Sequence, residues 1–303
     1  MKNILVIGSI NVDYVIHTPR LPKLGETLTG SDFAMNFGGK GANQAVALAK
    51  TGCNVKMLGA VGHDHSGELA INNLLSFGID CTDVMRVDAP TGAAVITVCN
   101  GDNHILLDIG ANAYVTPSEI EARESLFDWA DIVVMQYEIP MESVLFAARM
   151  TKKHKKILVI NPAPVKEADE EIYRLTDILI PNEFETQLIT GISPDDEKTT
   201  ADAVAALQNL GCSTVLITLG KRGCAYTEGT NLLYHGIFET KVADTTAAGD
   251  SFIGGICKSL CEGKSMREAV RYASAVSAIT VSRRGAGVSI PTADEVDEFL
   301  KSR

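Results

Sequence analysis

A run of small residues that ends in an acid, residues 244–250 (DTTAAGD), precedes a stretch with the pattern of a helix over 251–260. Small residues at the start of a helix let backbone N–H groups approach an anion, and the helix dipole favours negative charge there. A carboxylate at Asp250 would repel a bound phosphate, but it could take a proton from a hydroxyl group that attacks this phosphate. The run therefore predicts an anion cradle beside a general base, and the simpler alternative is that Asp250 only caps the helix. The catalytic residues in this interpretation are Asp250, Ala247, Ala248 and Gly249.

The elements that must hold this segment follow a regular pattern along the chain. Short apolar runs rich in β-branched residues alternate with amphipathic stretches of helical length, as in a mostly parallel sheet covered by helices. The runs are residues 4–7, 55–61, 132–135, 157–160, 178–180 and 215–219. Because no linker rich in Gly, Ser or Pro divides the chain, we expect one α/β domain over residues 1–303.

Two segments break this alternation. Residues 12–37, which contain Pro19 and Pro22, and residues 93–108, which turn at residues 101–103, have the pattern of antiparallel strands with no helix between them. Strands that do not join the main sheet indicate a small separate sheet. Such a sheet beside a crevice is typical of a lid over a binding site.

Composition limits the classes of function. The chain of 303 residues is 46% hydrophobic and 21% charged, which is ordinary for a globular protein with a large core. Its net charge of -11 argues against a nucleic-acid or anionic-membrane surface, because such surfaces need clustered Lys and Arg. The seven cysteines form no C-x-x-C pair, the apolar run over 4–7 is too short for a signal peptide, and no apolar run reaches the length of a membrane span. We therefore expect a cytoplasmic protein with reduced cysteines.

The run over 244–250 resembles the C-terminal signature of the ribokinase family of carbohydrate kinases, and other segments resemble motifs of this family in their order along the chain. These segments are residues 8–13 (GSINVD), 22–27 (P-x-x-G-E-T), 37–45 (FGGKGANQA), 62–68 (G-x-D-x-x-G-E), 135–138 (M-Q-x-E), 161–164 (NPAP), 181–185 (PNEFE), 218–223 (T-L-G-x-x-G) and 284–286 (RGA). The resemblance implies a ribokinase-like three-layer sandwich, with a mostly parallel central sheet flanked by helices and a small β-sheet lid. It also implies ATP-dependent phosphorylation of D-ribose at its 5-hydroxyl, and a homodimer that forms through the lid.

The resemblance further assigns roles to particular residues. Convergent carboxylates and amides suit a sugar, because its hydroxyl groups both donate and accept hydrogen bonds. The sugar-binding positions are Asn11, Asp13, Gly39, Lys40, Asn43, Glu138 and Asp250. The ATP-binding positions, which would act together with Mg²⁺, are Asn182, Glu185, Thr218, Gly220, Gly223, Gly249 and Ser274. The positions for an activating monovalent cation, typically K⁺, are Asp244, Thr246, Thr280, Arg283, Gly285 and Ser289.

Several alternatives stay open. Asn182 and Glu185 also fit a capping box at a helix start, a role that is compatible with binding Mg²⁺ through water. The acceptor can instead be 2-deoxyribose, fructose or adenosine, and the same fold can serve as a non-catalytic sugar-binding module. Two other nucleotide-binding classes are poorly supported, because Gly41 stands where a P-loop needs Ser or Thr and no G-x-G-x-x-G motif occurs.

Overall fold

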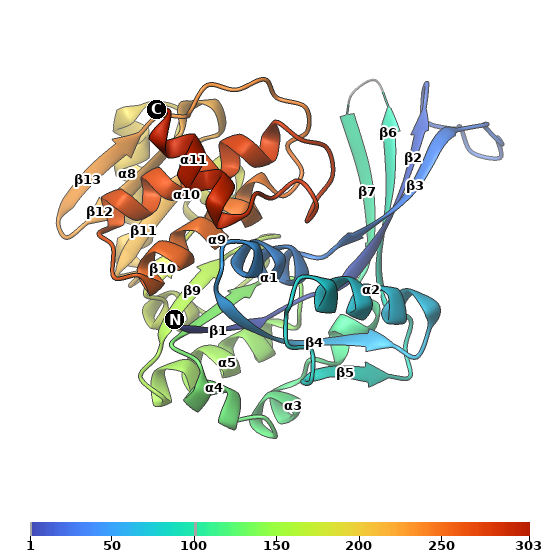
Figure 1. Ribbon diagram of the computed structural model, residues 1–303, viewed down its shortest axis with the longest axis horizontal. Coiled ribbons are helices and arrows are strands. Elements are labelled where there is room, and N and C mark those ends of the chain that lie inside the picture. Colours follow the sequence, from blue (N-terminus) through green and yellow to red (C-terminus); the bar gives the residue numbers. More distant parts are fainter. Residues whose placement is uncertain (1, 100–101) are drawn as a thin grey trace.

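The computed structural model describes residues 2–99 and 102–303, and its centre is a nine-stranded sheet (Figure 1). The strand order is β13-β12-β11-β10-β9-β8-β1-β4-β5. In this order, the seven strands from β11 across to β5 are parallel, whereas β12 and β13 form an antiparallel hairpin at one edge. The strands are β1 (Asn3–Ile7), β4 (Asn54–Gly62), β5 (Val84–Val87), β8 (Ile132–Gln136), β9 (Ile157–Asn161), β10 (Ile178–Leu179), β11 (Thr214–Thr218), β12 (Cys224–Glu228) and β13 (Asn231–His235). All the predicted strands of the main sheet are present, and β5, β12 and β13 at its edges are additional.

Helices cover both faces of this sheet because its strands bury both sets of alternating side chains. In β1, Ile4 and Val6 join one hydrophobic cluster, whereas Leu5 and Ile7 join the other. The first cluster includes α1 (Lys40–Lys50), α2 (His65–Ser76), α9 (Ala248–Cys261), α10 (Met266–Val281) and α11 (Ala293–Lys301). The second includes α3 (Pro117–Glu121), α4 (Ser125–Trp129), α5 (Met141–Lys153), α6 (Glu170–Leu175), α7 (Glu183–Thr190) and α8 (Glu197–Asn209). The predicted three-layer arrangement is therefore confirmed.

A separate four-stranded sheet in the order β3-β2-β6-β7 forms the predicted lid, which projects from the body in Figure 1. Its strands are β2 (Asn11–Thr18), β3 (Ser31–Gly38), β6 (Gly92–Cys99) and β7 (Asp102–Asp108). The pairs β2–β3 and β6–β7 are antiparallel, as predicted, and a parallel pair between β2 and β6 joins them, with Asn11 opposite Gly92. The predicted turn over 101–103 falls partly on residues 100–101, which lie outside the described residues.

The run over 244–250 ends within α9. This helix begins at Ala248, earlier than the sequence pattern predicts, so Gly249 and Asp250 lie in its first turn. Ala247 is the N-cap residue and has a left-handed backbone with a φ of 59°. A residue with a side chain is strained in this region, and such strain is typical of turns that serve a function. In the part of the chain that the structure describes, no helix has the length and apolar character needed to cross a membrane.

Candidate active site

A cavity opens at the carboxyl ends of β9, β10 and β11, close to the starts of α1, α7 and α9. Parallel strands bring their carboxyl ends to one edge of a sheet, and ligands of open α/β sheets bind there. The lining residues are Lys40, Asn161, Ile180, Asn182, Glu185, Thr218, Thr245, Ala247, Ala248, Gly249, Asp250 and Ile253. The cavity therefore brings together the predicted cradle, the predicted base and residues predicted to bind the sugar and the nucleotide.

The cradle is the first turn of α9. The N–H groups of Gly249 and Asp250 find no acceptor among the described residues, as is usual in the first turn of a helix. The N–H group of Ala248 instead donates to the carbonyl of Thr245 at 3.2 Å. The carbonyl of Ala248 accepts from the hydroxyl of Ser277 at 2.9 Å, which ties the turn to α10. Free N–H groups at a helix start attract an anion such as phosphate.

Asp250 is buried next to this turn, with 7% of the residue exposed. Its Oδ1 accepts from Gln44 Nε2 at 3.0 Å, and its Oδ2 accepts from Asn43 Nδ2 at 3.2 Å. Ala247 occupies the N-cap position and no side chain caps the helix, so the carboxylate is not a helix cap. A carboxylate at a cavity wall beside free N–H groups has the position that a general base for a phosphate acceptor needs.

Three of the predicted sugar-binding residues lie where the lid meets the main sheet. Asn11 is buried, and its Oδ1 accepts from Asn112 Nδ2 at 2.8 Å. Burial, followed by the negative charge of Glu138, raises the pKa of Asp13 to about 6. Gly39 has a φ of 87°, and a Cβ atom there would lie 2.8 Å from the backbone N of Asn11. Only glycine allows this close approach at the base of the lid.

Glu138 and Lys40 extend this group towards the base. Glu138 Oε2 accepts from Ser9 Oγ at 2.5 Å and from the backbone N–H of Lys40 at 3.0 Å. Burial alone would lower the pKa of the Lys40 amine, but three carboxylates outweigh this effect and raise it. The three belong to Asp250, Glu138 and Glu185. Lys40 therefore remains a cation in the cavity, where it can offset part of the charge of an incoming phosphate.

The predicted nucleotide-binding residues divide into two groups. Asn182 Oδ1 accepts from the N–H of Glu185 at 2.8 Å, and Glu185 Oε2 accepts from the N–H of Asn182 at 2.8 Å. The capping box of α7 is therefore present, and both residues also line the cavity. Thr218, at the end of β11, lines it as well. Gly249, in the first turn of α9, also lines the cavity. The residues that lie outside the lining, and whose roles stay predictions, are Gly220, Gly223 and Ser274.

Three of the residues predicted to hold a monovalent cation, Asp244, Thr246 and Gly285, are joined by hydrogen bonds where the loop before α9 meets the end of α10. Asp244 Oδ1 accepts from the N–H of Thr246 at 2.9 Å, and Oδ2 accepts from the N–H of Gly285 at 3.0 Å. Partial burial acts to raise the pKa of Asp244, but these hydrogen bonds and the charge of Arg284 lower it below its usual value. The other positions, on α10 and in the segment after it, are Thr280, Arg283 and Ser289. Asp244 is therefore a stable anion in this loop.

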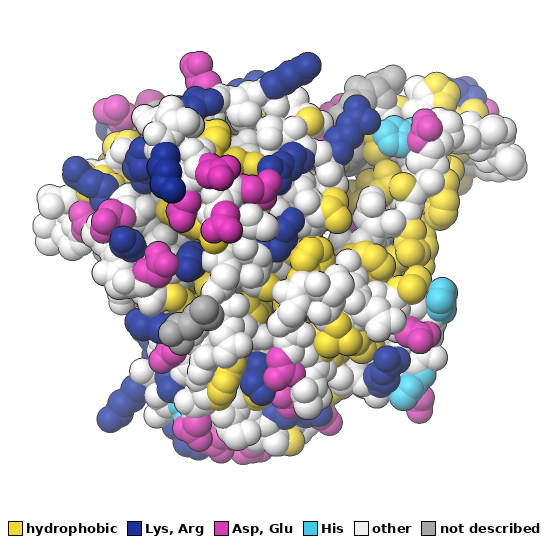
Figure 2. All heavy atoms as spheres, viewed as in Figure 1, with side chains coloured by type: hydrophobic (Ala, Val, Ile, Leu, Met, Phe, Trp, Pro, Cys, Tyr) yellow, Lys and Arg dark blue, Asp and Glu magenta, His cyan; other side chains and the backbone are white. Residues whose placement is uncertain are grey.

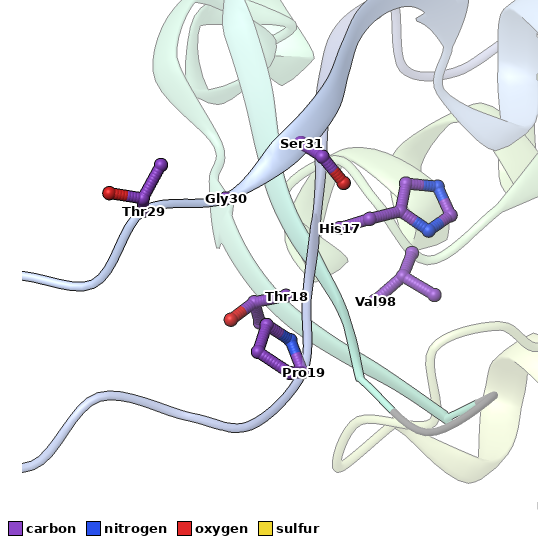
Figure 3. Close-up of a pocket in the computed structure, with 7 residues that line it drawn as sticks. All are labelled: His17, Thr18, Pro19, Thr29, Gly30, Ser31 and Val98. Carbon is purple, nitrogen blue, oxygen red and sulfur yellow. The ribbon is translucent and has the colours of Figure 1, made fainter.

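A second hollow lies at the outer end of β2 and has a different character. Figure 3 shows it where the chain leaves β2 at Thr18 and enters β3 at Ser31. Its lining residues are His17, Thr18, Pro19, Thr29, Gly30, Ser31 and Val98. His17 is the only titratable side chain among these residues, and they include no carboxylate, lysine, arginine or helix start, so the hollow has no anion cradle beside a base. We therefore place the candidate active site at Asp250.

The site also contains polar residues to which the sequence analysis gave no role. Lys40, Asn43 and Gln44 have the i, i+3, i+4 spacing of one helix face, so this spacing could have indicated that Gln44 faces the site. Gln136 and Asn161 end β8 and β9, and the ends of parallel strands are a second signal. The residues missed are Ser9, Gln44, Asn112, Gln136, Asn161 and Ser277.

Known proteins resemble this chain over its whole length. Residues 1–293 match the model of the pfkB family carbohydrate kinase. The chain is 40% identical to a ribokinase of Haemophilus influenzae, over 99% of both chains, and 34% identical to a deoxyribokinase of Salmonella typhi, over 98% of both. The structure of Arabidopsis thaliana ribokinase complexed with ribose and ATP matches with a TM-score of 0.94 at 32% identity, over 99% of both chains. The chain therefore belongs to the pfkB family of carbohydrate kinases.

Proposed function

We propose that this protein transfers the γ-phosphoryl group of ATP to the 5-hydroxyl of D-ribose, which gives ribose 5-phosphate and ADP. The observation that carries the proposal is one cavity in which the buried carboxylate of Asp250 adjoins the free N–H groups of α9. A base beside an anion cradle suits phosphoryl transfer to a hydroxyl group. The choice of ribose is supported by the relative named ribokinase at 40% identity and by the complex of the Arabidopsis relative with ribose and ATP.

In this mechanism the sugar binds between the lid and the carboxyl edge of the main sheet. Carboxylates accept hydrogen bonds from its hydroxyl groups, and amides both donate and accept. The residues that hold the sugar are Asn11, Asp13, Gly39, Lys40, Asn43 and Glu138. The raised pKa of Asp13 reflects a partly desolvated carboxylate, whose hydrogen bonds to a sugar are strong once the lid excludes water.

The phosphoryl group moves along a line from the nucleotide to the sugar. Asp250 takes the proton of the 5-hydroxyl as the sugar oxygen forms a bond to the γ-phosphorus, and the bond from this phosphorus to the β,γ-bridging oxygen breaks. ADP leaves with the electron pair of the broken bond, and the proton stays on Asp250 until the products depart. The N–H groups at the start of α9 stabilise the negative charge on the transferring group.

The nucleotide lies on the side of the cavity that Asn182, Glu185 and Thr218 line. Within residues 2–99 and 102–303, no group of three or more His, Cys, Asp or Glu side chains is arranged to hold a metal ion. Mg²⁺ would therefore be bound chiefly by the phosphates of ATP, with Asn182 and Glu185 acting through water. Burial raises the pKa of Glu185, and a nearby cation would favour its charged form.

An assay of ADP release with a panel of acceptors tests the proposal. The panel contains D-ribose, 2-deoxy-D-ribose, D-fructose and adenosine, and ³¹P NMR of the product locates the phosphate. We expect the highest kcat/KM with D-ribose and a phosphate on its 5-oxygen. If ribose binds in calorimetry but no acceptor promotes ADP release, the chain is a sugar-binding module and the proposal is wrong.

2-Deoxyribose is the second candidate, because the deoxyribokinase of Salmonella typhi is 34% identical over 98% of both chains. The two sugars differ by the hydroxyl group at carbon 2. A site that hydrogen-bonds this hydroxyl leaves polar groups unpaired when the hydroxyl is missing, which costs roughly 1–3 kcal/mol. A kcat/KM for 2-deoxyribose that equals or exceeds the value for ribose would favour this candidate.

We also propose that K⁺ activates the enzyme from a site beside the cradle. The carboxylate of Asp244 is anionic, and it lies beside the carboxyl end of α10, where the helix dipole is negative. Carboxylate and carbonyl oxygens are ligands that suit a hard cation of low charge. A positive charge there would strengthen the hold of the neighbouring N–H groups on phosphate.

We propose a homodimer that forms through the lid. Large apolar side chains are exposed on the lid strands, and Figure 2 shows hydrophobic side chains over this part of the molecule. Phe33, Met35, Val95 and Leu106 lie on one face of the lid, whereas Ile105 and Leu107 lie on the other. An exposed apolar patch supports contact with a partner, and two copies of one patch can cover each other about a two-fold axis.

We propose that the protein works in the cytoplasm. The seven cysteines are free thiols, at Cys53, Cys81, Cys99, Cys212, Cys224, Cys257 and Cys261. Burial raises the pKa of Cys212 and of Cys224 to about 12, so both thiols are unreactive. Buried thiols without disulfides are typical of a reducing compartment.

A further inference from the structure

A buried chain of amide side chains leads from a main-chain carbonyl to the base. Asn161 Nδ2 donates to the carbonyl of Ile180 at 2.9 Å. Gln44 Nε2 donates to Asn161 Oδ1 at 3.3 Å and to Asp250 Oδ1 at 3.0 Å. Gln136 Nε2 in turn donates to Gln44 Oε1 at 2.6 Å. Four elements of the fold, β8, β9, α1 and α9, therefore meet in one hydrogen-bonded network at the carboxylate.

The main-chain carbonyl at the end of this network sets the orientation of every amide in it. A carbonyl only accepts, so Asn161 turns its Nδ2 towards Ile180 and its Oδ1 towards Gln44. Gln44 then faces two oxygen acceptors, Asn161 Oδ1 and Asp250 Oδ1. Its NH₂ group is the only end that suits them, because the opposite orientation would set its oxygen against both. The donor side of Gln44 is thus directed at the base.

The burial of these amides needs a reason. Gln44 and Gln136 are fully buried, and an amide in an apolar setting is unfavourable unless its hydrogen bonds are made. Gln136 Oε1 has no partner among the described residues, and a Cβ atom on Gly8 would lie 2.1 Å from it. Apolar side chains of similar size would fill the space without these costs. A role that needs a directed donor explains why amides stand here.

We propose that Gln44 is a positioning residue, which holds Asp250 Oδ1 so that Oδ2 is presented to the sugar hydroxyl. This inference rests on the proposed function, because it assigns Asp250 the role of base. A hydrogen bond to a carboxylate is stronger than one between neutral groups. Without it, the carboxylate can turn about its terminal bond, and Oδ2 leaves the side of Asn43, where the sugar is expected. Gln136 in turn holds Gln44, through the hydrogen bond that Gln136 donates to Gln44 Oε1.

The test is a double-mutant cycle in kcat with Gln44→Met and Asp250→Asn, at saturating ribose and ATP. Methionine keeps the size of glutamine and removes its whole amide, both the donor to Asp250 and the acceptor for Gln136. We expect Gln44→Met to lower kcat roughly 10- to 100-fold while the Kd of ribose and of ATP changes less than about threefold. In the Asp250→Asn background the same substitution should have no further effect, because no base remains to be positioned. A role in packing alone would lower kcat by the same factor in both backgrounds and would overturn the inference.

Two further variants keep the test decisive. Thr51→Val alters an equally buried polar residue at the C-cap of α1, whose hydroxyl donates to the carbonyls of Ala47 and Leu48 in that helix, and it should leave kcat unchanged. Gln136→Met leaves Gln44 in place, so it should lower kcat several-fold and only when Asp250 is present. If Gln44→Met does not fold, the Gln136→Met variant tests the positioning role of the network in its place. Unchanged kcat in both glutamine variants contradicts the inference, whereas unchanged kcat in Asp250→Asn itself contradicts the proposed function.

Discussion

Helices α1 and α9 pack so closely that glycine is needed between them, whereas the two outer strands of the lid, β3 and β7, leave most of their side chains in solvent. A Cβ atom on Gly254 of α9 would lie 2.6 Å from Ala47 Cβ of α1. In the lid, every described residue of β7 is exposed, and so are most residues of β3. We call the contact between α1 and α9 the seam; it carries Asn43, Gln44 and Asp250.

The difference between the seam and the lid indicates a division of labour. A base that must take a proton at the moment of transfer needs a fixed position, and close packing with satisfied hydrogen bonds supplies it. A sheet with few buried contacts opens at low free-energy cost, which suits an element that must admit a sugar and then cover it. We therefore expect substitutions in the seam to act on kcat, and substitutions in the lid to act on binding and assembly.

The largest effect is expected from Asp250→Asn in the seam. Removal of the base should lower kcat by roughly 10²–10⁴, as for other enzymes that lose a general base. The matched control is Asp196→Asn, because Asp196 caps α8 and is not among the residues that line the cavity. Steady-state ADP release measures both variants. Equal kcat values for the two would show that Asp250 has no special role.

The next effect is expected from Asp13→Ala, at the base of the lid. Loss of this carboxylate leaves sugar hydroxyl groups unpaired, so the KM for ribose should rise roughly 10- to 100-fold while that for ATP changes little. Calorimetry with each ligand separates the two affinities. An equal loss of both would remove Asp13 from the sugar site.

Asp13 also predicts a dependence on pH. Its pKa is raised to about 6 by burial and by Glu138, so its acceptor capacity is complete above this pH and is lost as the pH falls through it. The affinity for ribose should therefore fall below pH 6 in the wild type. Asp13→Asn should bind ribose weakly at every pH and lose this dependence, and an unchanged slope in that variant would assign the titration to another group.

A smaller effect is expected at the cation loop beside the seam. If K⁺ is replaced by tetramethylammonium at equal ionic strength and fixed Mg²⁺, ribose phosphorylation should slow several-fold, because the bulky ion cannot reach the Asp244 carboxylate. Asp244→Ala should be slow in both salts. Full activation of this variant by K⁺, or equal wild-type rates in both salts, would show that the cation site is misplaced or absent.

The smallest effect on turnover is expected from Leu106→Lys on β7. Leu106 is 76% exposed, so the substitution should leave the fold intact and dissociate the proposed dimer. The control is Leu75→Lys on α2, which is 51% exposed and lies outside the lid. Sedimentation velocity should give monomers for the first variant and dimers for the second. A wild type that is monomeric at all concentrations contradicts the lid dimer.

The sequence predicts the main elements because each carries its own local pattern. The unbroken apolar run of β1 and the run of small residues before α9 are local signals, and they were sufficient for a mostly parallel sheet covered by helices and for the position of Asp250. The start of α9 was predicted too late, because Gly249 and Asp250 are weak helix formers in any local scale. The tertiary packing of the helix outweighs this preference.

The network around Asp250 could not be predicted, because it depends on the order of strands in the sheet. Gln44, Gln136 and Asn161 are far apart in the sequence and meet only because β1, β8 and β9 are neighbours. A pattern of parallel strands does not specify which strands are adjacent. The hairpin of β12 and β13 was missed because both strands are short and mix apolar with polar residues, so neither contains a long apolar run.

The division of labour between seam and lid is tested most directly by calorimetric titration of the Asp250→Asn variant. Ribose and a non-hydrolysable ATP analogue with Mg²⁺ are each titrated into this variant and into the wild type. If Asp250 acts as the base and recognition lies elsewhere, both Kd values should stay within about threefold of the wild type while turnover is lost. If either ligand loses affinity in proportion to the loss of kcat, Asp250 is a binding residue and the account of the seam is wrong.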